Sequence, residues 1–153
     1  MMRILAIGRM RAGPEADLIA RYATRIRPRL DVTEIAEAAG SPDEVKRREG
    51  AALIAVLPRH AFAIALDQEG TAPDSLGFAA LLEQWLGLGR PVCFLIGGAE
   101  GLDRTVIDRA DATLSLGRLT WPHMLARVML AEQLYRARMI VSGHPYHRAG
   151  RPV

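Results

Sequence analysis

The chain has 153 residues, half of them hydrophobic, and a formal net charge of +3 at pH 7. This length fits one domain with a substantial core, and the apolar content excludes an intrinsically disordered chain. No apolar run reaches the roughly 18 uninterrupted residues of a membrane helix, so we expect a soluble, cytoplasmic protein without a membrane partner.

Charge is distributed unevenly along the chain. Residues 1–30 and 118–153 each carry a balance of +5, whereas residues 31–117 carry −7. If the two basic ends meet in space, they form a face that attracts phosphate; solvated helix faces are the alternative explanation.

The first half of the chain alternates between strand and helix patterns, which is typical of a parallel sheet flanked by helices. Residues 3–8 predict a first strand, and residues 14–27 an amphipathic helix that begins at a proline. Residues 31–38 predict an edge strand. Residues 41–58 predict a helix that a serine caps, although a glycine interrupts its pattern.

The pattern continues with residues 61–67, a near-continuous apolar run that predicts a strand buried on both faces. Residues 72–89 predict a helix capped by Asp74 or Ser75. Residues 91–98, "PVCFLIGG", form the most hydrophobic run and predict a central strand.

The last third of the chain predicts a short helix over residues 102–110, then a strand and loop over residues 111–121. The final predicted helix has Pro122 as its first residue and runs to Gly143. Its apolar residues cover more than one face, so it must be buried in the core or against a partner chain.

Two glycine-containing loops follow predicted strands. The first, "FLIGGAEGLDRT" (94–105), has neither the dinucleotide spacing G-x-G-x-x-G nor the lysine of a P-loop. The second, "LSLGRLTWPH" (114–123), offers backbone amides before a helix and the flat surface of Trp121. With "ALDQEG" (65–70), these segments form three loops at the carboxyl ends of neighbouring strands, where ligands of open α/β sheets bind.

The tail "SGHPYHRAGRPV" (142–153) contains candidate functional residues. His144 and His147 have H-x-x-H spacing, but no cysteine or carboxylate follows to complete a metal site. Tyr146, His147 and Arg148 combine stacking, proton transfer and phosphate binding, unless the tail is merely a polar terminus. The only cysteine, Cys93, excludes a disulfide framework and is expected to be core filler.

The segments "LIGGAEGL", "SLGRLTWPHMLARVMLAEQLYRARMI" and "HPYHR", in this order, closely resemble the ribosomal RNA large subunit methyltransferase H family of the SPOUT superfamily. The similarity covers essentially the whole chain. It implies a single domain over residues 1–153, with an α/β fold whose mostly parallel sheet is flanked by helices. It also implies a deep C-terminal trefoil knot at about residues 91–148 and a homodimer packed through the knot-region helices.

The resemblance implies S-adenosylmethionine as methyl donor and no metal. As acceptor, it implies N3 of a pseudouridine in helix 69 of 23S rRNA within the assembled ribosome. It places Tyr146, His147 and Arg148 in a tail that reaches over the partner chain's cofactor. The positions that match cofactor contacts are Leu66, Gly97, Leu116, Gly117, Arg118, Leu119, Thr120 and Trp121.

Methyl transfer from a sulfonium is a direct displacement, which requires alignment and a dry site. We expect His147 to take the N3 proton or to orient the imide, and Tyr146 to stack or hydrogen-bond on the base. We expect Arg148 to bind phosphate or to stabilise the developing imidate. Two other functions are compatible with the residues: a ribosome-associated RNA-binding module without turnover, and a flavodoxin-like nucleotide binder.

Overall fold

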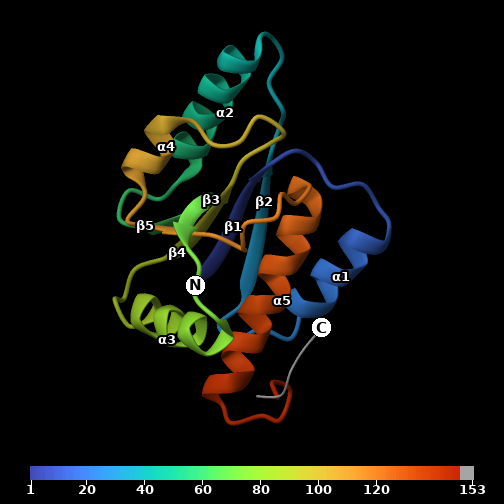
Figure 1. The fold of residues 1–153 in the computed structure, drawn as a ribbon, viewed down its shortest axis with the longest axis vertical. Helices are drawn as coiled ribbons and strands as arrows, with labels where there is room; N and C mark the ends of the chain where they lie inside the picture. The colour runs from blue at the N-terminus through green and yellow to red at the C-terminus, as the bar shows by residue number, and fades with distance from the viewer. Residues whose placement is uncertain (149–153) are drawn as a thin grey trace.

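The computed structural model describes residues 1–148, which form a parallel sheet with helices on both faces (Figure 1). The predicted α/β class is therefore confirmed. The strand order is β2-β1-β4-β3-β5, which differs from the 2-1-3-4-5 order of flavodoxin-like folds and excludes that alternative. The strands are β1 (Met2–Ile7), β2 (Leu30–Ile35), β3 (Phe62–Thr71), β4 (Val92–Ile96) and β5 (Ala112–Leu114).

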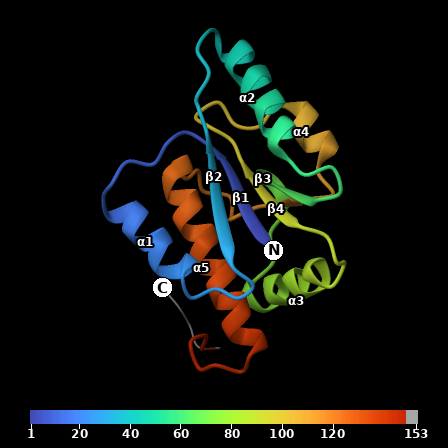
Figure 2. The ribbon, with the colours of Figure 1, turned by 180° about the vertical axis from the view of Figure 1, so that it is seen from behind.

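The helices form two layers, one on each face of the sheet (Figures 1 and 2). On one face, α5 packs between α1 and α3, and on the other α2 packs against α4. The helices are α1 (Pro14–Ala23), α2 (Pro42–Val56), α3 (Ser75–Leu86), α4 (Arg104–Arg109) and α5 (His123–Val141).

Alternation along the strands divides the core into two parts. Ile4 and Phe94 face the side of α1, α3 and α5, whereas Leu5 and Leu95 face α2 and α4. All five residues of β4 are buried, which confirms its predicted central place and explains its continuous apolar run. Cys93 lies in this strand, where burial raises the pKa of its thiol.

Several predicted boundaries are wrong, among them the end of the third strand and both ends of the last helix. The third strand ends at Thr71 rather than at residue 67, because Leu114 pairs with both Leu66 and Thr71 across a bulge. The last helix begins at His123, because the backbone of Pro122 is extended (φ −56°, ψ 140°) and Pro122 serves as the N-cap. Its end is Val141, two residues before Gly143, whose φ of +74° does not continue a helix.

The two basic ends of the chain meet, since α1 and α5 pack against each other. Arg138 in α5 donates from Nε to the carbonyl oxygen of Arg27 at 2.7 Å. The same guanidinium pairs with Glu83 in α3. Part of the positive charge at this junction is therefore neutralised within the fold.

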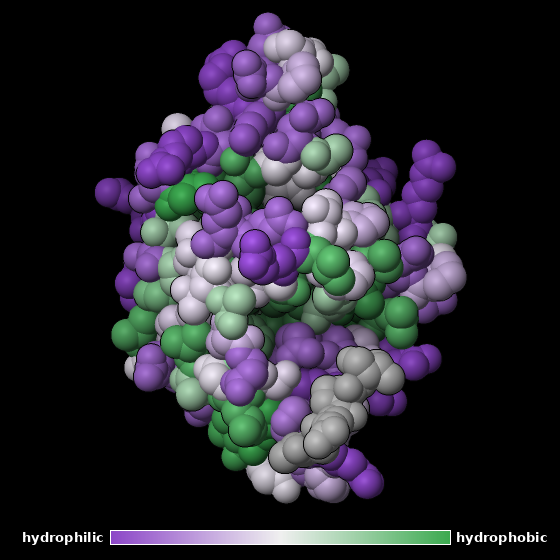
Figure 3. All heavy atoms as spheres, viewed as in Figure 1, coloured by the Kyte–Doolittle hydropathy of each residue, from purple (hydrophilic) through white to green (hydrophobic). Residues whose placement is uncertain are grey.

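The surface differs between the ends of the molecule (Figure 3). In this view, hydrophilic residues dominate the upper end over α2, whereas hydrophobic residues gather over the middle and lower parts around α3 and α5. Leu76 belongs to α3, Leu88 follows it, and Leu125 and Val141 belong to α5; all four are exposed.

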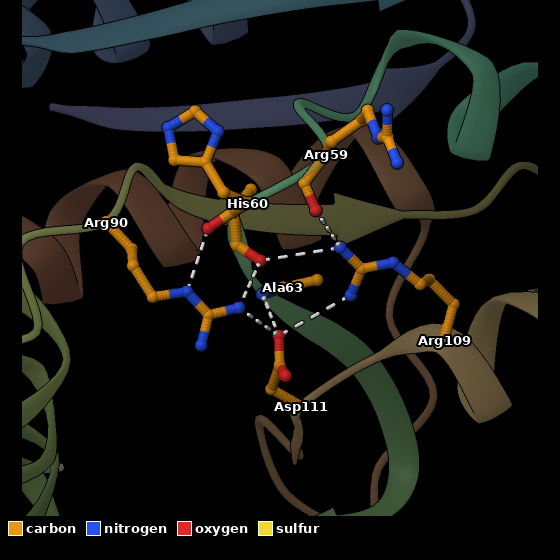
Figure 4. A network of polar contacts seen from close by, with 7 residues as sticks. Arg59, His60, Ala63, Arg90, Arg109 and Asp111 are labelled. Carbon is orange, nitrogen blue, oxygen red and sulfur yellow. Dashed lines mark hydrogen bonds and ion pairs between the residues drawn. The ribbon is translucent and has the colours of Figure 1, made fainter.

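A polar network closes the amino-terminal edge of the sheet (Figure 4). The Asp111 carboxylate accepts from the backbone N–H of Ala63 at 2.8 Å and pairs with Arg90 and Arg109 at 3.6 and 3.5 Å. The Arg90 guanidinium also donates to the carbonyl of His60 at 2.8 Å. This network links the segments that precede β3, β4 and β5, and it lies at the edge opposite the loops considered next.

Candidate functional site

A cavity of about 520 Å³ lies at the carboxyl edge of the sheet. Residues of β3 and the loops that follow β4 and β5 enclose it, and these three strands are neighbours in the sheet, as predicted. The predicted loop at residues 65–70 is part of β3, which runs to Thr71. The start of α5, one side chain of α2 and two side chains of α4 complete the wall. The lining residues are Lys46, Leu66, Asp67, Gln68, Ile96, Gly97, Gly98, Ala99, Gly101, Leu102, Arg104, Ile107, Leu114, Leu116, Gly117, Leu119, Thr120, Trp121, His123 and Ala126.

The loop after β4 folds back on itself because glycine occupies position 97. The Gly101 N–H donates to the Gly98 carbonyl at 3.0 Å. A Cβ at Gly97 would lie 2.7 Å from the Gly101 carbonyl carbon and 3.1 Å from the Leu102 nitrogen. Gly97 therefore makes room for the loop's own backbone, and through it shapes the cavity wall.

Asp103 ends this loop and begins α4. Its carboxylate accepts from the backbone N–H and the hydroxyl of Thr105, which together hold the pKa of Asp103 below its usual value. The cap fixes where α4 starts, and Arg104 and Ile107 of α4 line the cavity.

The loop after β5 is held by side chains on both of its sides. The buried Ser115 hydroxyl donates to the Gly117 carbonyl and accepts from its N–H, both at 3.1 Å. Gly117 has φ +110°, a conformation that favours glycine. From β3, Gln68 Nε2 donates to the Arg118 carbonyl at 3.0 Å and to the Thr120 hydroxyl at 3.2 Å.

Exposed apolar side chains stand at the cavity mouth. Leu119 is 71% exposed and Trp121 39% exposed, and both line the cavity. Large apolar side chains exposed beside a cavity are typical of a site that a ligand or partner covers. Asp67, Lys46 and Arg104 add charged groups of both signs to the wall.

Seven of the eight residues predicted to contact a cofactor line this cavity. The exception is Arg118, whose backbone carbonyl binds Gln68 but whose side chain is not part of the wall. Sequence reasoning missed Asp67 and Gln68, although both directly follow Leu66. It also missed Lys46, which comes from α2 and carries no local signal.

A buried arginine joins the start of α5 to the end of β1. Arg127 is 0% exposed, and its Nη2 donates to the carbonyls of Ile7 and Gly8, both at 3.1 Å. Burial lowers the pKa of its guanidinium, and Glu34, at 3.6 Å, opposes that shift. Arg127 thereby anchors the helix start that closes the cavity; the sequence analysis did not single it out.

The tail residues lie at the other end of α5. The chain then folds back along the helix, so that the Tyr146 hydroxyl donates to Glu132, nine residues or about 14 Å along α5 from His123. The Tyr146 ring packs edge-on against Tyr135, with centroids 4.8 Å apart. Arg148 is exposed, and residues 149–153 lie outside the described part of the chain. Within one chain, the structure does not bring Tyr146, His147 and Arg148 together with the cavity.

The tail is tied to α5 by a compact polar cluster. Glu132 Oε1 accepts from the Tyr146 hydroxyl at 3.0 Å and from Arg136 Nη2 at 2.7 Å. Arg136 Nη1 lies 3.1 Å from His147 Nδ1. Burial, reinforced by the hydrogen bond to Glu132, raises the pKa of Tyr146, which keeps this hydroxyl protonated.

Residues 1–148 contain neither a metal-binding cluster nor a membrane-spanning helix. This part of the chain contains no cluster of three or more His, Cys, Asp or Glu side chains able to hold a metal ion. None of its helices is both long enough and apolar enough to span a membrane.

A comparison with one solved structure supports the fold. The chain superposes on the SpoU methyltransferase AviRb from Streptomyces viridochromogenes with a TM-score of 0.50 and 18% identity, over 94% of this chain and 61% of AviRb. A second AviRb structure, in complex with AdoMet, gives a TM-score of 0.49 and 16% identity, over 90% of this chain and 57% of AviRb.

Sequence comparisons identify the family. The family described as "Predicted SPOUT methyltransferase" matches residues 1–147. A ribosomal RNA large subunit methyltransferase H from Gluconacetobacter diazotrophicus is 67% identical over 99% of both chains. A protein of the same name from Acidiphilium cryptum is 60% identical over 99% of this chain and 96% of its own. The chain therefore belongs to the SPOUT methyltransferase family, within the group of ribosomal RNA large subunit methyltransferases H.

Proposed function

We propose that this protein transfers a methyl group from S-adenosylmethionine to N3 of a pseudouridine in helix 69 of 23S rRNA, on the assembled ribosome. The observation that carries the proposal is the cavity at the carboxyl edge, which gathers seven predicted cofactor contacts from β3 and from the loops after β4 and β5. The relatives' shared name supplies the ribosomal RNA substrate. The helix 69 acceptor rests on the motif resemblance alone.

The residues around the cavity fit S-adenosylmethionine. A volume of about 520 Å³ lies in the range of about 300–1,000 Å³ typical of small-molecule sites. Leu116 and Trp121 offer apolar surface for an adenine ring, and Asp67 offers a carboxylate for hydroxyl or ammonium groups. When bound, the cofactor supplies an electrophilic methyl group. The loops hold it in line with the acceptor and keep water out.

The acceptor side of the active site is assigned to the tail of a second chain in a homodimer. Two observations support this arrangement: none of Tyr146, His147 and Arg148 lines the cavity of its own chain, and apolar side chains are exposed along α3 and α5. In the partner's site, His147 and Tyr146 contact the base, and Arg148 binds phosphate or stabilises developing negative charge.

The chain path is assigned to a single domain over residues 1–153 with a deep trefoil knot at about residues 91–148. The support is the return of the chain from β5, at one edge of the sheet, to α5 between α1 and α3. Ribosomes as substrate imply the cytoplasm as the place of action. A crystal structure of the dimer with S-adenosylmethionine tests the knot and the tail position together.

The decisive activity test uses ribosomes from cells that lack this protein. The protein is incubated with these ribosomes and labelled S-adenosylmethionine, and the label is then located in the RNA. We expect label at one pseudouridine of helix 69 and none on ribosomes without that pseudouridine. Calorimetry with S-adenosylmethionine distinguishes the enzyme from an RNA-binding module without turnover, which need not bind the cofactor.

A further inference from the structure

The polar cluster at the tail restricts what His147 can do. The contact between Arg136 Nη1 and His147 Nδ1 is 3.1 Å long. A guanidinium has only N–H donors and keeps its charge at any pH at which proteins fold. The histidine nitrogen must therefore accept, which requires that Nδ1 carries a lone pair and no proton.

Arg136 is itself held in place from the opposite side. Its Nε and Nη2 donate to Glu132 Oε1 at 3.0 and 2.7 Å, and its plane lies over the Tyr146 ring, 4.9 Å from the centroid. Glu132 Oε2 accepts from Gln133 at 3.0 Å, and Gln133 accepts from the Ser75 hydroxyl of α3. The guanidinium therefore has little freedom to turn away from His147.

A neutral imidazole with a bare Nδ1 carries its proton on Nε2. We propose that Glu132 and Arg136 fix His147 as the Nε2–H tautomer, so that His147 donates a hydrogen bond to the acceptor base instead of removing its proton. In this arrangement Glu132 and Arg136 are positioning residues, and the functional part of the proposal rests on the proposed methyl transfer.

The tautomer also defines the class of base that the site favours. A uracil-type ring carries a carbonyl on each side of N3, and negative charge moves onto these oxygens when N3 loses its proton. An N–H donor directed at one of them stabilises that charge as an oxyanion hole does. Cytosine shares the carbonyl at C2 but has an amino group, a donor, at C4. The proposal therefore places the Nε2–H at the C4 carbonyl, where cytosine cannot accept the hydrogen bond. His147 thus favours a base with an imide.

The His147 tautomer is tested by NMR on the unliganded protein, so the test does not depend on methyl transfer. Protein labelled with ¹⁵N-histidine gives long-range ¹H–¹⁵N correlations, and the His147 signals are those lost in His147→Gln. We expect a bare Nδ1 and a protonated Nε2 at neutral pH, and an averaged Nδ1 signal in Arg136→Met, where the ring is released. A proton on Nδ1 in the wild type, or no change in Arg136→Met, overturns the proposal.

The role of His147 as a hydrogen-bond donor is tested by comparing two substitutions of this residue. The amide nitrogen of glutamine reaches the place of Nε2 and donates a hydrogen bond, but it cannot take a proton. We expect His147→Gln to keep kcat within about tenfold of the wild type, and His147→Ala to lose about 10²–10³-fold. Equal losses in both, with cofactor affinity unchanged by calorimetry, overturn the donor role and favour a base.

Two controls complete the design. Arg136→Met alone should lower kcat, but it should cause no further loss when added to His147→Ala, because Arg136 acts through the His147 ring. Additive losses overturn the positioning role. His60→Gln, at the opposite edge of the sheet, should leave kcat unchanged. If the wild type does not methylate rRNA at all, the proposed function fails, whereas the spectra still decide the tautomer.

Discussion

At the scale of single residues, glycine at position 97 serves the loop more directly than the ligand. The motif resemblance predicted a cofactor contact there, and Gly97 does line the cavity. Its missing side chain, however, is explained by the Gly101 backbone, 2.7 Å from the place of a Cβ. A return contact between residues four apart depends on the folded loop, so the sequence pattern could not reveal it.

We expect Gly97→Ala to weaken S-adenosylmethionine binding about tenfold, about 1.4 kcal/mol, because the 98–101 turn must move into the cavity. Calorimetric titration measures this change. Gly89→Ala is the matched control: its φ of +68° makes alanine strained, but Gly89 lies before β4, at the opposite edge of the sheet. That variant should lose stability and keep its cofactor affinity; equal affinity losses in both variants would contradict the local explanation.

At the scale of elements, the contact between α2 and α4 depends on a glycine inside a helix. Gly50 interrupts the helical pattern predicted for residues 41–58, yet α2 is continuous from Pro42 to Val56. A Cβ at Gly50 would lie 2.8 Å from Asp103 Cβ and 3.2 Å from Val106 Cγ2. The glycine is therefore a packing requirement, which local helix propensity does not report.

We expect Gly50→Ala to destabilise the fold by about 1–3 kcal/mol, because overpacking outweighs the gain in helix propensity. Urea denaturation measures the change in the free energy of unfolding. Ala51→Gly, at the exposed neighbouring position, serves as the control and should cost about 1 kcal/mol through propensity alone. A stabilised Gly50→Ala variant would mean that α4 shifts without cost.

The network around Asp111 is a second feature of the elements. We expect Asp111→Ala to lower the free energy of unfolding by about 1–3 kcal/mol, because the Ala63 N–H and two guanidinium groups lose an acceptor. Asp108→Ala removes an exposed ion pair with Arg104 and should cost at most about 1 kcal/mol. Thermal or urea unfolding of both variants measures the difference. Equal losses of unfolding free energy would mean that the Asp111 network does not stabilise the sheet.

At the scale of the whole molecule, local patterns predicted the layered α/β fold, the central place of β4 and the meeting of three neighbouring strands at the site. Periodicity and apolar runs carry that information because neighbouring residues determine strand and helix. Such patterns did not predict that the tail folds back onto α5 without lining the cavity, because the contact between Tyr146 and Glu132 forms only once helix and tail are both placed. They also left Lys46 and Arg127 unassigned, since each joins the site from a distant element.

The proposed dimer, in which each tail serves the partner's cavity, predicts complementation between two inactive chains. Gly97→Val blocks the cavity and His147→Ala removes a tail residue, so each homodimer should be inactive. A mixture refolded together should recover about a quarter of wild-type activity, because half of the dimers are mixed and each contains one intact site. Methylation assays on the mixture measure the recovery. Chains whose tails served their own cavities would show no recovery, and sedimentation confirms that both variants dimerise.

The contrast between the two edges of the sheet has a consequence for how the molecule opens. The amino-terminal edge is locked by the Asp111 network, whereas glycine-containing turns form the carboxyl edge. Opening free energies should therefore differ along the same strands, with rapid amide hydrogen exchange at residues 98–101 and 116–121 and slow exchange at residues 62–65 and 92–95. A ligand can then enter at one edge through local opening while the other edge preserves the sheet.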